Sequence, residues 1–338
     1  MKTAVIGTGR MGRRHIQVVK EMKLDLVGIC DVNSDSLLLA EKEQGVSLDL
    51  HFHDSEALFD KIHPEVVVIA TTAPTHATYT KMAVEAGAKF ILCEKPMAVS
   101  LAECNEIITV CKQNNVGLAI NHQMRFMPNY IEPKKIFESE SFGGLCSVAV
   151  LGGNFGAAMN GSHYFEMFRF LTDEIPNSVT AWFSKNKIAN PRGPQFEDKA
   201  GSIRLTNPSG KRLYMDFSED QGHGLTVIYS GRNGQLIVNE LDGIMYLVER
   251  EEQYRSLPTS RYGMPAVQKT ISLPPTEVIA PTKATLSALL EGKNPPSGED
   301  GRQVVATLVA AMISSEKDSQ PVTPDMANLP VDRIFPWA

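Results

Sequence analysis

The stretch "TAVIGTGRMGRRH", residues 3–15, says most about the fold. Its first four residues are apolar or β-branched, which predicts a buried strand, and a helix is expected over about residues 10–20. Three glycines stand between the two with the spacing G-x-G-x-x-G. The first makes a tight turn, the second admits a pyrophosphate, and the third lets the helix pack on the strand. We therefore expect a dinucleotide to bind at Gly7, Thr8, Gly9, Arg10, Met11 and Gly12.

An acidic residue follows at the distance that such a site requires. Asp31 closes the next expected strand, residues 26–30, about 20 residues after the glycines, where a carboxylate hydrogen-bonds the adenosine ribose hydroxyls. A carboxylate would repel a 2′-phosphate, so Asp31 favours NAD as the cofactor. The guanidinium of Arg10 could reach a phosphate, and NADP therefore stays open.

The first third of the chain alternates short apolar runs with amphipathic helices. Strands are expected at residues 3–7, 26–30, near 50–52, 66–70, 90–93 and 116–120. Continuous apolar runs such as "VVVIA" and "FILC" are typical of strands covered on both faces. The pattern predicts an α/β fold, a Rossmann-type doubly wound parallel sheet, over residues 1–122.

The remainder of the chain, residues 123–338, has a different texture. Runs rich in β formers recur at hairpin-like spacing, separated by turn signals such as "NPSG" and "GRNG". Helices are expected at about residues 281–292 and 301–315. This predicts an α+β domain on one large, mostly antiparallel sheet, with a tail, about residues 318–338, that could pack back on the first domain.

Composition narrows the class of protein. The 338 residues are 43% hydrophobic and 21% charged, as in an ordinary soluble globular protein, and the net charge of −6 argues against nucleic acid or an anionic membrane as a partner. No run is long enough for a membrane helix and the first residues do not form a signal peptide. The five cysteines include no C-x-x-C pair, so we expect a cytoplasmic protein with reduced thiols and no bound metal.

More polar residues fall where the parallel strands should end, the edge at which such sheets bind ligands. They are Thr71, Thr72 and Ala73 after the fourth strand, Glu94 and Lys95 after the fifth, and Asn121 after the sixth. The charged pair interrupts "FILCEKPMAV", residues 90–99, and burying such a pair is costly unless it is paired or functional. We expect all six residues to line the cofactor site.

Together these stretches resemble the Gfo/Idh/MocA oxidoreductases, the family of glucose–fructose oxidoreductase and inositol dehydrogenase. The matching pieces are "AVIGTGRMGRRH", "TTAPTHATYTKMAVEAGAKFILCEKPMAVSLAE", "NHQMRFMP" and "NGSHYFEMFRFL", and E-K-P is the most specific of their motifs. The resemblance implies hydride transfer between nicotinamide and a secondary hydroxyl or ketone of a sugar, cyclitol or sugar nucleotide. It also implies that residues 123–338 bind the substrate and carry an open sheet, through which a homodimer or homotetramer forms.

The resemblance makes Lys95 the E-K-P lysine beside the nicotinamide, and His163 the histidine that opens a helix in the second domain. Oxidation of an alcohol needs a base for the hydroxyl proton, and an imidazole suits this near neutral pH. Our hypothesis is that His163 is the base while Lys95, oriented by Glu94 or a backbone carbonyl, stabilises charge on the reacting oxygen. The two side chains should then converge on one carbon, and a cis peptide at Pro96 could fix the direction of Lys95.

The chain departs from the family at one position. Many members have an aspartate four residues before the histidine, where this sequence has Met159 followed by Asn160. An amide can orient an imidazole but cannot stabilise its cation as a carboxylate does. Either Asn160 serves instead or His163 is less basic, and Glu166, one helical turn on, could compensate in part.

For several further residues the sequence leaves two possible roles open. His76 could lie near the nicotinamide or cap its helix, and Arg125 could reach a ligand or join the domains by a salt bridge. His122, Gln123 and Tyr164 are candidates for substrate contact beside Asn121 and His163. His15 should pack or face solvent, and residues 190–201 could be a covering loop or a plain surface loop.

Two other functions stay open. One is a regulatory protein that binds a dinucleotide on the same scaffold without turnover. The other is an enzyme that cleaves glycosides by transient oxidation with tightly held NAD.

Overall fold

The chain begins with a parallel sheet whose strand order is β3-β2-β1-β4-β5-β6. Its strands are β1 (Lys2–Ile6), β2 (Asp25–Cys30), β3 (His51–Phe52), β4 (Val66–Ile69), β5 (Phe90–Cys93) and β6 (Gly117–Ile120). The order reverses between β1 and β4, which is the point where such sheets bind ligands. The predicted doubly wound sheet is confirmed, including the short third strand expected near residues 50–52.

The structure is a computed structural model that describes residues 1–153, 155–188, 190–218, 220–258 and 265–338. Contacts divide it into two compact units. Unit 1 comprises residues 1–123, 277–305 and 330–338, and unit 2 comprises residues 124–276 and 306–329. The chain therefore returns twice to unit 1 after residue 123.

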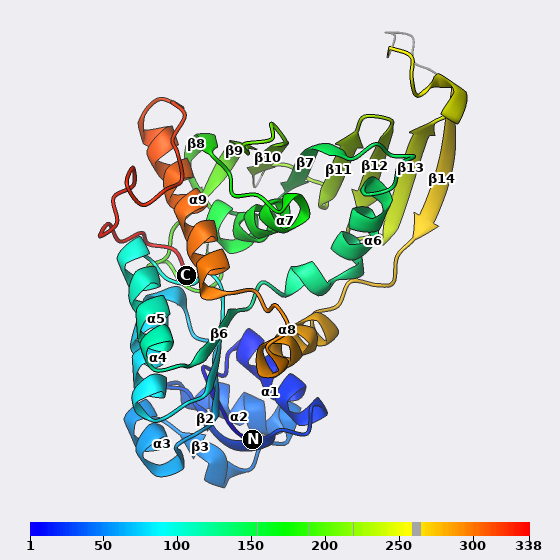
Figure 1. Ribbon diagram of the computed structural model, residues 1–338. Helices are drawn as coiled ribbons and strands as arrows, with labels where there is room; N and C mark the ends of the chain where they lie inside the picture. The colour runs from blue at the N-terminus through cyan, green and yellow to red at the C-terminus, as the bar shows by residue number, and fades with distance from the viewer. Residues whose placement is uncertain (154, 189, 219, 259–264) are drawn as a thin grey trace. The chain divides into compact units, whose positions relative to one another are not determined.

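Helices cover both faces of the unit 1 sheet (Figure 1). They are α1 (Arg10–Glu21), α2 (Ser34–Gln44), α3 (Ser55–Ile62), α4 (His76–Glu85), α5 (Leu101–Gln113) and α8 (Ile279–Glu291), with short 3₁₀ turns at η1 (Leu48–Leu50) and η2 (Ala73–Thr75). Val5 and Val68 of the strands pack in one core with Ile16 of α1 and Leu286 of α8. Because α8 completes this core, a late segment of the chain is part of the first fold.

The last residues also belong to unit 1. The indole Nε1 of the buried Trp337 donates a hydrogen bond to the carbonyl of Ala98 at 3.0 Å, and the amide of Phe335 donates to the carbonyl of Val99 at 2.9 Å. The rings of Phe335 and Trp337 stack with centroids 4.7 Å apart. The tail thus lies against the segment that follows the E-K-P motif.

Unit 2 is built on a sheet whose described strands have the order β14-β13-β12-β11-β7-β10-β9-β8. They are β7 (Leu145–Gly153), β8 (Ser178–Ile188), β9 (Asp198–Thr206), β10 (Arg212–Ser218), β11 (Thr226–Gly231), β12 (Gly234–Asn239), β13 (Ile244–Arg250) and β14 (Ala266–Ser272). All neighbouring pairs are antiparallel except β7 and β10, which run parallel. The predicted large, mostly antiparallel sheet is confirmed.

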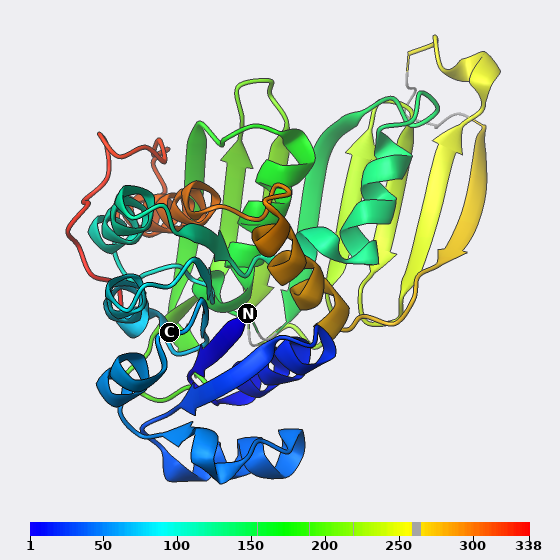
Figure 2. The ribbon, with the colours of Figure 1, turned by 60° about the horizontal axis from the view of Figure 1, so that its bottom comes forward.

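Helices α6 (Pro128–Phe137) and α7 (Ser162–Thr172) lie on one face of this sheet (Figures 1 and 2). A 3₁₀ turn, η3 (Gln123–Phe126), precedes α6, a π turn, η4 (Ala157–Gly161), leads into α7, and a further 3₁₀ turn is η5 (Glu252–Tyr254). Helix α9 (Gly298–Glu316) begins in unit 1 and ends in unit 2. Among the described residues, no helix has the length and apolar character needed to cross a membrane.

Candidate active site

The glycine turn after β1 has the shape that a bound pyrophosphate needs. Gly7 has φ +89°, and a Cβ there would come within 2.8 Å of the backbone at Ala70 and Thr71. A Cβ on Gly12 would lie 1.9 Å from the Gly7 carbonyl, whereas one on Gly9 would meet nothing within 4 Å. Gly7 and Gly12 are therefore required by close packing, and Gly9 leaves room for a ligand to approach the backbone.

The first turn of α1 is open to an anion. Its N-cap is Gly9, with no side chain bound to the first amides and no acidic residue in the turn. Orphan amides and the positive end of the helix dipole together favour a phosphate group. The residues present thus fit the pyrophosphate of NAD.

Asp31 is tied to this glycine turn. Its Oδ2 accepts hydrogen bonds from the Thr8 amide at 2.7 Å and the Thr8 hydroxyl at 3.1 Å, while Oδ1 accepts from the Asn33 amide at 2.9 Å. The carboxylate therefore has a fixed position at the end of β2, beside the phosphate-binding turn.

The loop after β4 carries Thr71, Thr72 and Ala73, and the fully buried His76 links it to another segment. Its Nε2 lies 3.2 Å from the carbonyl of Thr71 and its Nδ1 lies 3.2 Å from the carbonyl of Met97. The N-cap of α4 is Thr75, so the imidazole does not cap the helix. Burial lowers the pKa of His76. The ring connects the β4 loop to the chain that follows E-K-P.

Glu94 and Lys95 stand at the end of β5 and are 5% and 9% exposed. Oε1 of Glu94 accepts hydrogen bonds from Nε2 of His15 at 2.7 Å and Nδ2 of Asn121 at 2.8 Å. The peptide between Lys95 and Pro96 is cis. Burial alone would raise the pKa of Glu94, but the bond to and charge of His15, the bond from Asn121 and the charge of Lys95 lower it to about 2.

His15 is a residue that the sequence reasoning missed. It is 1% exposed on α1, so it packs, which was one of the two alternatives that we expected. What we did not expect is its bond to Glu94, 79 positions away in the sequence. A signal was present, because positions 12, 15, 16 and 19 fall on one face of a helix and the other three are Gly12, Ile16 and Val19. That face packs on the sheet, so His15 had to meet a partner there.

In unit 2, His163 is the second residue of α7 and is half-buried. The π turn before it holds Met159 and the half-buried Asn160. A carboxylate does support this turn, but it comes from β9: Asp198 accepts the amide hydrogens of Ala158 at 2.9 Å and Met159 at 2.8 Å. The sequence reasoning missed Asp198, since a partner 39 positions away leaves no local pattern.

Arg125 forms the salt bridge that the sequence suggested, but both partners belong to unit 2. Its guanidinium pairs with the buried Glu166 and lies over the ring of Phe170, 5.0 Å from its centroid. Arg169 also binds Glu166, with Nε 2.8 Å from Oε2. Glu166 is therefore shared by two arginines of its own unit.

Tyr164 is buried and its hydroxyl donates to Oε2 of Glu240 at 3.0 Å. The hydroxyl of Tyr130 donates to Oε1 of the same carboxylate at 3.1 Å. At the end of unit 1, His122 and Gln123 are buried beside Asn121. The expected convergence of Lys95 and His163 stays a prediction, because the two residues belong to different units.

Comparisons with known proteins agree with this fold and these motifs. Residues 1–122 match a family described as "Oxidoreductase family, NAD-binding Rossmann fold", GFO_IDH_MocA. Over these residues the chain is similar to the Gfo/Idh/MocA oxidoreductases. The resemblance to this family, the Rossmann fold and the NAD-binding character predicted from the sequence are thereby confirmed.

The curated relatives of this chain are distant from it and match only part of its length. D-apiose dehydrogenase of Paraburkholderia graminis is 30% identical over 128 residues, which are 38% of this chain and 33% of that protein. Inositol 2-dehydrogenase of Klebsiella pneumoniae (strain 342) is 23% identical over 222 residues, 60% of this chain and 65% of that protein. The matched part of the chain spans less than two thirds of each of these relatives.

Solved structures extend the likeness of fold to nearly the whole chain. An oxidoreductase from Agrobacterium radiobacter, in complex with NAD⁺, L-tartaric acid and magnesium, superposes with a TM-score of 0.79 at 19% identity, covering 96% of this chain and 98% of that one. The fold of both units is thus shared with this solved oxidoreductase structure.

Proposed function

We propose that this protein is an NAD(P)-dependent oxidoreductase that acts on a secondary hydroxyl, or the corresponding ketone, of a polyhydroxylated small molecule. The observation that carries the proposal is Lys95, held beside the buried Glu94 at the ligand-binding edge of a sheet with a phosphate-binding turn. Two relatives are named dehydrogenases of D-apiose and of inositol. A sugar or cyclitol is therefore the substrate class we propose.

In this function unit 1 holds the cofactor. The amides at the start of α1 and the open position at Gly9 would hold the pyrophosphate, and Asp31 the adenosine ribose. Bound NAD(P) supplies the hydride acceptor or donor. Thr71, Thr72 and Ala73, at the end of β4, would lie along the cofactor.

Lys95 and His163 are the residues to which we assign the remaining chemistry. The Lys95 ammonium would stabilise negative charge that develops on the reacting oxygen, and the His163 imidazole would take up the hydroxyl proton. Asp198, which accepts hydrogen bonds from the Ala158 and Met159 amides, would hold in place the turn that precedes His163. The candidates for positioning the substrate remain Asn160, His122, Gln123, Arg125 and Tyr164.

The direct test is NADH formation by the purified chain with NAD⁺ and a panel of cyclitols, aldoses, other polyols and glycosides. Steady reduction of NAD⁺ with at least one compound is expected, and NADP⁺ serves as the comparison. Consumption of a panel glycoside without net NADH would instead support transient oxidation. Binding of NAD⁺ without any conversion across the panel would support the regulatory protein.

We also propose that two copies of the chain associate through the open face of the unit 2 sheet. This face exposes several large side chains, of which Trp182 is 61%, Tyr246 46%, Tyr214 42% and Leu151 38% exposed. Exposed apolar patches on a sheet are typical of interaction sites. The proposed occupant is a second copy, presenting the same face.

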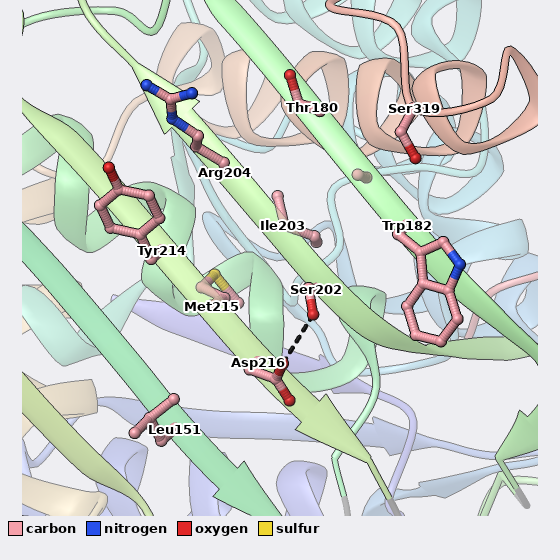
Figure 3. A pocket seen from close by; sticks show the side chains of 11 residues that line it. Leu151, Thr180, Trp182, Ser202, Ile203, Arg204, Tyr214, Met215, Asp216 and Ser319 are labelled. Atoms are coloured by element: carbon pink, nitrogen blue, oxygen red, sulfur yellow. Dashed lines mark hydrogen bonds between the residues drawn. The ribbon is translucent and has the colours of Figure 1, made fainter.

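The chemistry of the patch suits a self-complementary contact. It includes a hollow of about 330 Å³ lined by residues of β7 to β10, among them Trp182, Arg204, Tyr214 and Asp216 (Figure 3). The guanidinium of Arg204 lies 5.8 Å from the centroid of the Tyr214 ring, and Ser202 donates to Asp216 at 2.7 Å. Because one face carries both Arg204 and Asp216, a two-fold related copy can pair the opposite charges.

The cysteines support a reducing compartment, and we propose the cytoplasm. All five lie in described residues as free thiols, and four of them are buried. Burial raises the pKa of Cys30 and of Cys111 to about 12, so these thiols are unreactive at neutral pH.

A further inference from the structure

The Glu94 carboxylate receives an unusual number of directed contacts for a buried acid. Oε1 accepts from Nε2 of His15 and Nδ2 of Asn121, and Oε2 lies 3.3 Å from the backbone nitrogen of Lys95. His15 and Asn121 are 1% and 0% exposed. Because neither side chain can donate to solvent, Glu94 is the acceptor for both donors.

The two donors come from the elements that surround the cofactor-binding edge. His15 lies on α1, the helix that starts at the glycine turn, and Asn121 follows β6. The backbone amide of Asn121 donates a hydrogen bond to the carbonyl of Cys93 at 2.7 Å. This bond fixes the backbone from which the Asn121 side chain reaches Glu94. The position of the Glu94 carboxylate therefore depends on the glycine-turn helix and on the last strand of the sheet.

The chain on the far side of Lys95 is fixed independently. Met97 is held by His76, and the next two residues, Ala98 and Val99, by the tail through Trp337 and Phe335. Because the backbone is fixed at residues 97–99, the conformation around Lys95 can vary mainly in its side chain and in the orientation of the neighbouring Glu94 carboxylate. A single orientation of Glu94 gives the ammonium a single electrostatic environment.

We propose that His15 and Asn121 are positioning residues that fix the Glu94 carboxylate and, through it, the direction and charge environment of Lys95. This inference deepens the proposed function, on which its kinetic part rests. Neither residue would touch the substrate. Their effect should therefore appear in the turnover number, with little change in the affinity for NAD⁺.

The test compares His15→Leu and Asn121→Leu, which remove the donors, with His15→Gln, which keeps an N–H donor. Val18→Ala is the matched control, because it truncates a buried side chain of the same helix that has no hydrogen-bond donor to offer Glu94. The first readout needs no substrate: the ¹³Cε shift of Lys95 in lysine-labelled protein is followed from neutral to alkaline pH, with Lys95→Arg to assign the signal. Calorimetry with NAD⁺ gives the cofactor affinity.

Both leucine variants should move the Lys95 titration midpoint downward, because a mobile carboxylate stabilises the ammonium less well. With any panel compound that reduces NAD⁺, their kcat should fall about 10²-fold, the cost of a small misplacement. KM and the Kd for NAD⁺ should change little. His15→Gln should recover most of both effects, and Val18→Ala should lower only the thermal midpoint.

The two proposals fail in different ways. An unchanged Lys95 midpoint in both leucine variants would overturn the positioning role, whatever the activity. A shifted midpoint in a protein that converts no panel compound would leave the positioning role standing and count against the oxidoreductase. If His15→Leu does not fold, Glu94→Gln takes its place, and a midpoint that stays unchanged when this charge is removed overturns the proposal equally.

Discussion

At the scale of single residues, Asp31 combines two roles. Its carboxylate accepts hydrogen bonds from the Thr8 amide and hydroxyl. In the proposed function its charge would stand where a 2′-phosphate of NADP would come. Asp31→Asn keeps an acceptor for Thr8 but removes the charge. The ratio of NADP⁺ to NAD⁺ affinity should therefore rise by about tenfold or more, since two like charges at close range near a surface repel by several kcal/mol.

Calorimetric titration of both cofactors measures this ratio. The control is Asp35→Asn, an exposed acid in the first turn of α2, which should leave the ratio unchanged. An unaltered preference in Asp31→Asn would mean that the carboxylate does not select the cofactor.

Glu94 makes a prediction about acid stability. Because the fold lowers its pKa from 4.5 to about 2, its contribution is fully present above pH 4.5 and is lost as the pH falls toward 2. At neutral pH this contribution is roughly 3 kcal/mol. Thermal unfolding of the wild type and of Glu94→Gln should therefore differ strongly at pH 7 and much less at pH 3. A gap that stays constant over this range would contradict the lowered pKa.

The residues that the sequence singled out are those that belong to a local sequence pattern. The glycine turn, Asp31 and Lys95 lie at fixed spacings from strand ends and could be placed without coordinates. His15 and Asp198 could not be paired in the same way, because their partners, Glu94 and the turn at Met159, lie 79 and 39 positions away. The sequence can indicate that such a residue is buried, but only the fold identifies the residue that it contacts.

At the scale of elements, Glu240 joins the two helices of unit 2 to its sheet. It follows β12 and accepts hydrogen bonds from Tyr130 of α6 and Tyr164 of α7. Burial raises its pKa to about 6, although the two tyrosine hydroxyls act in the opposite direction. The folded unit therefore prefers the protonated acid, and loses stability as the pH rises from 4.5 to about 6.

Glu240→Gln should remove this dependence. The amide can still bond both tyrosines, so the variant should match the wild type near pH 4 and exceed its stability by roughly 2 kcal/mol above pH 7. Thermal midpoints across this range provide the measurement, and the exposed Glu252→Gln is the control. A Glu240→Gln variant that is less stable than the wild type at pH 8 would refute the raised pKa.

Element order was predictable where connections are short. The alternation of strands and helices in unit 1 and the hairpins β11 to β13 follow from local turns and periodicity. The parallel contact between β7 and β10 and the return of α8 to the unit 1 core depend on partners distant in sequence. Hydrophobicity alone does not choose between two cores that could both bury the same helix.

At the scale of the whole molecule, the open sheet predicts self-association. Trp182→Arg places a charge within the proposed contact, at its most exposed apolar side chain, and should shift the protein toward the monomer in sedimentation experiments. Leu241→Arg is the matched control, since Leu241 is 74% exposed in the turn between β12 and β13. Equal sedimentation of the wild type and Trp182→Arg would exclude this face as the interface.

The central claim is that Lys95 takes part in hydride-transfer chemistry, and Lys95→Ala tests it most directly. The measurement is steady-state NADH formation with the best compound of the polyol panel, together with NAD⁺ binding by calorimetry. We predict that turnover falls by about 10²-fold or more while the NAD⁺ affinity stays close to that of the wild type. Turnover of Lys95→Ala at the wild-type rate would contradict the account.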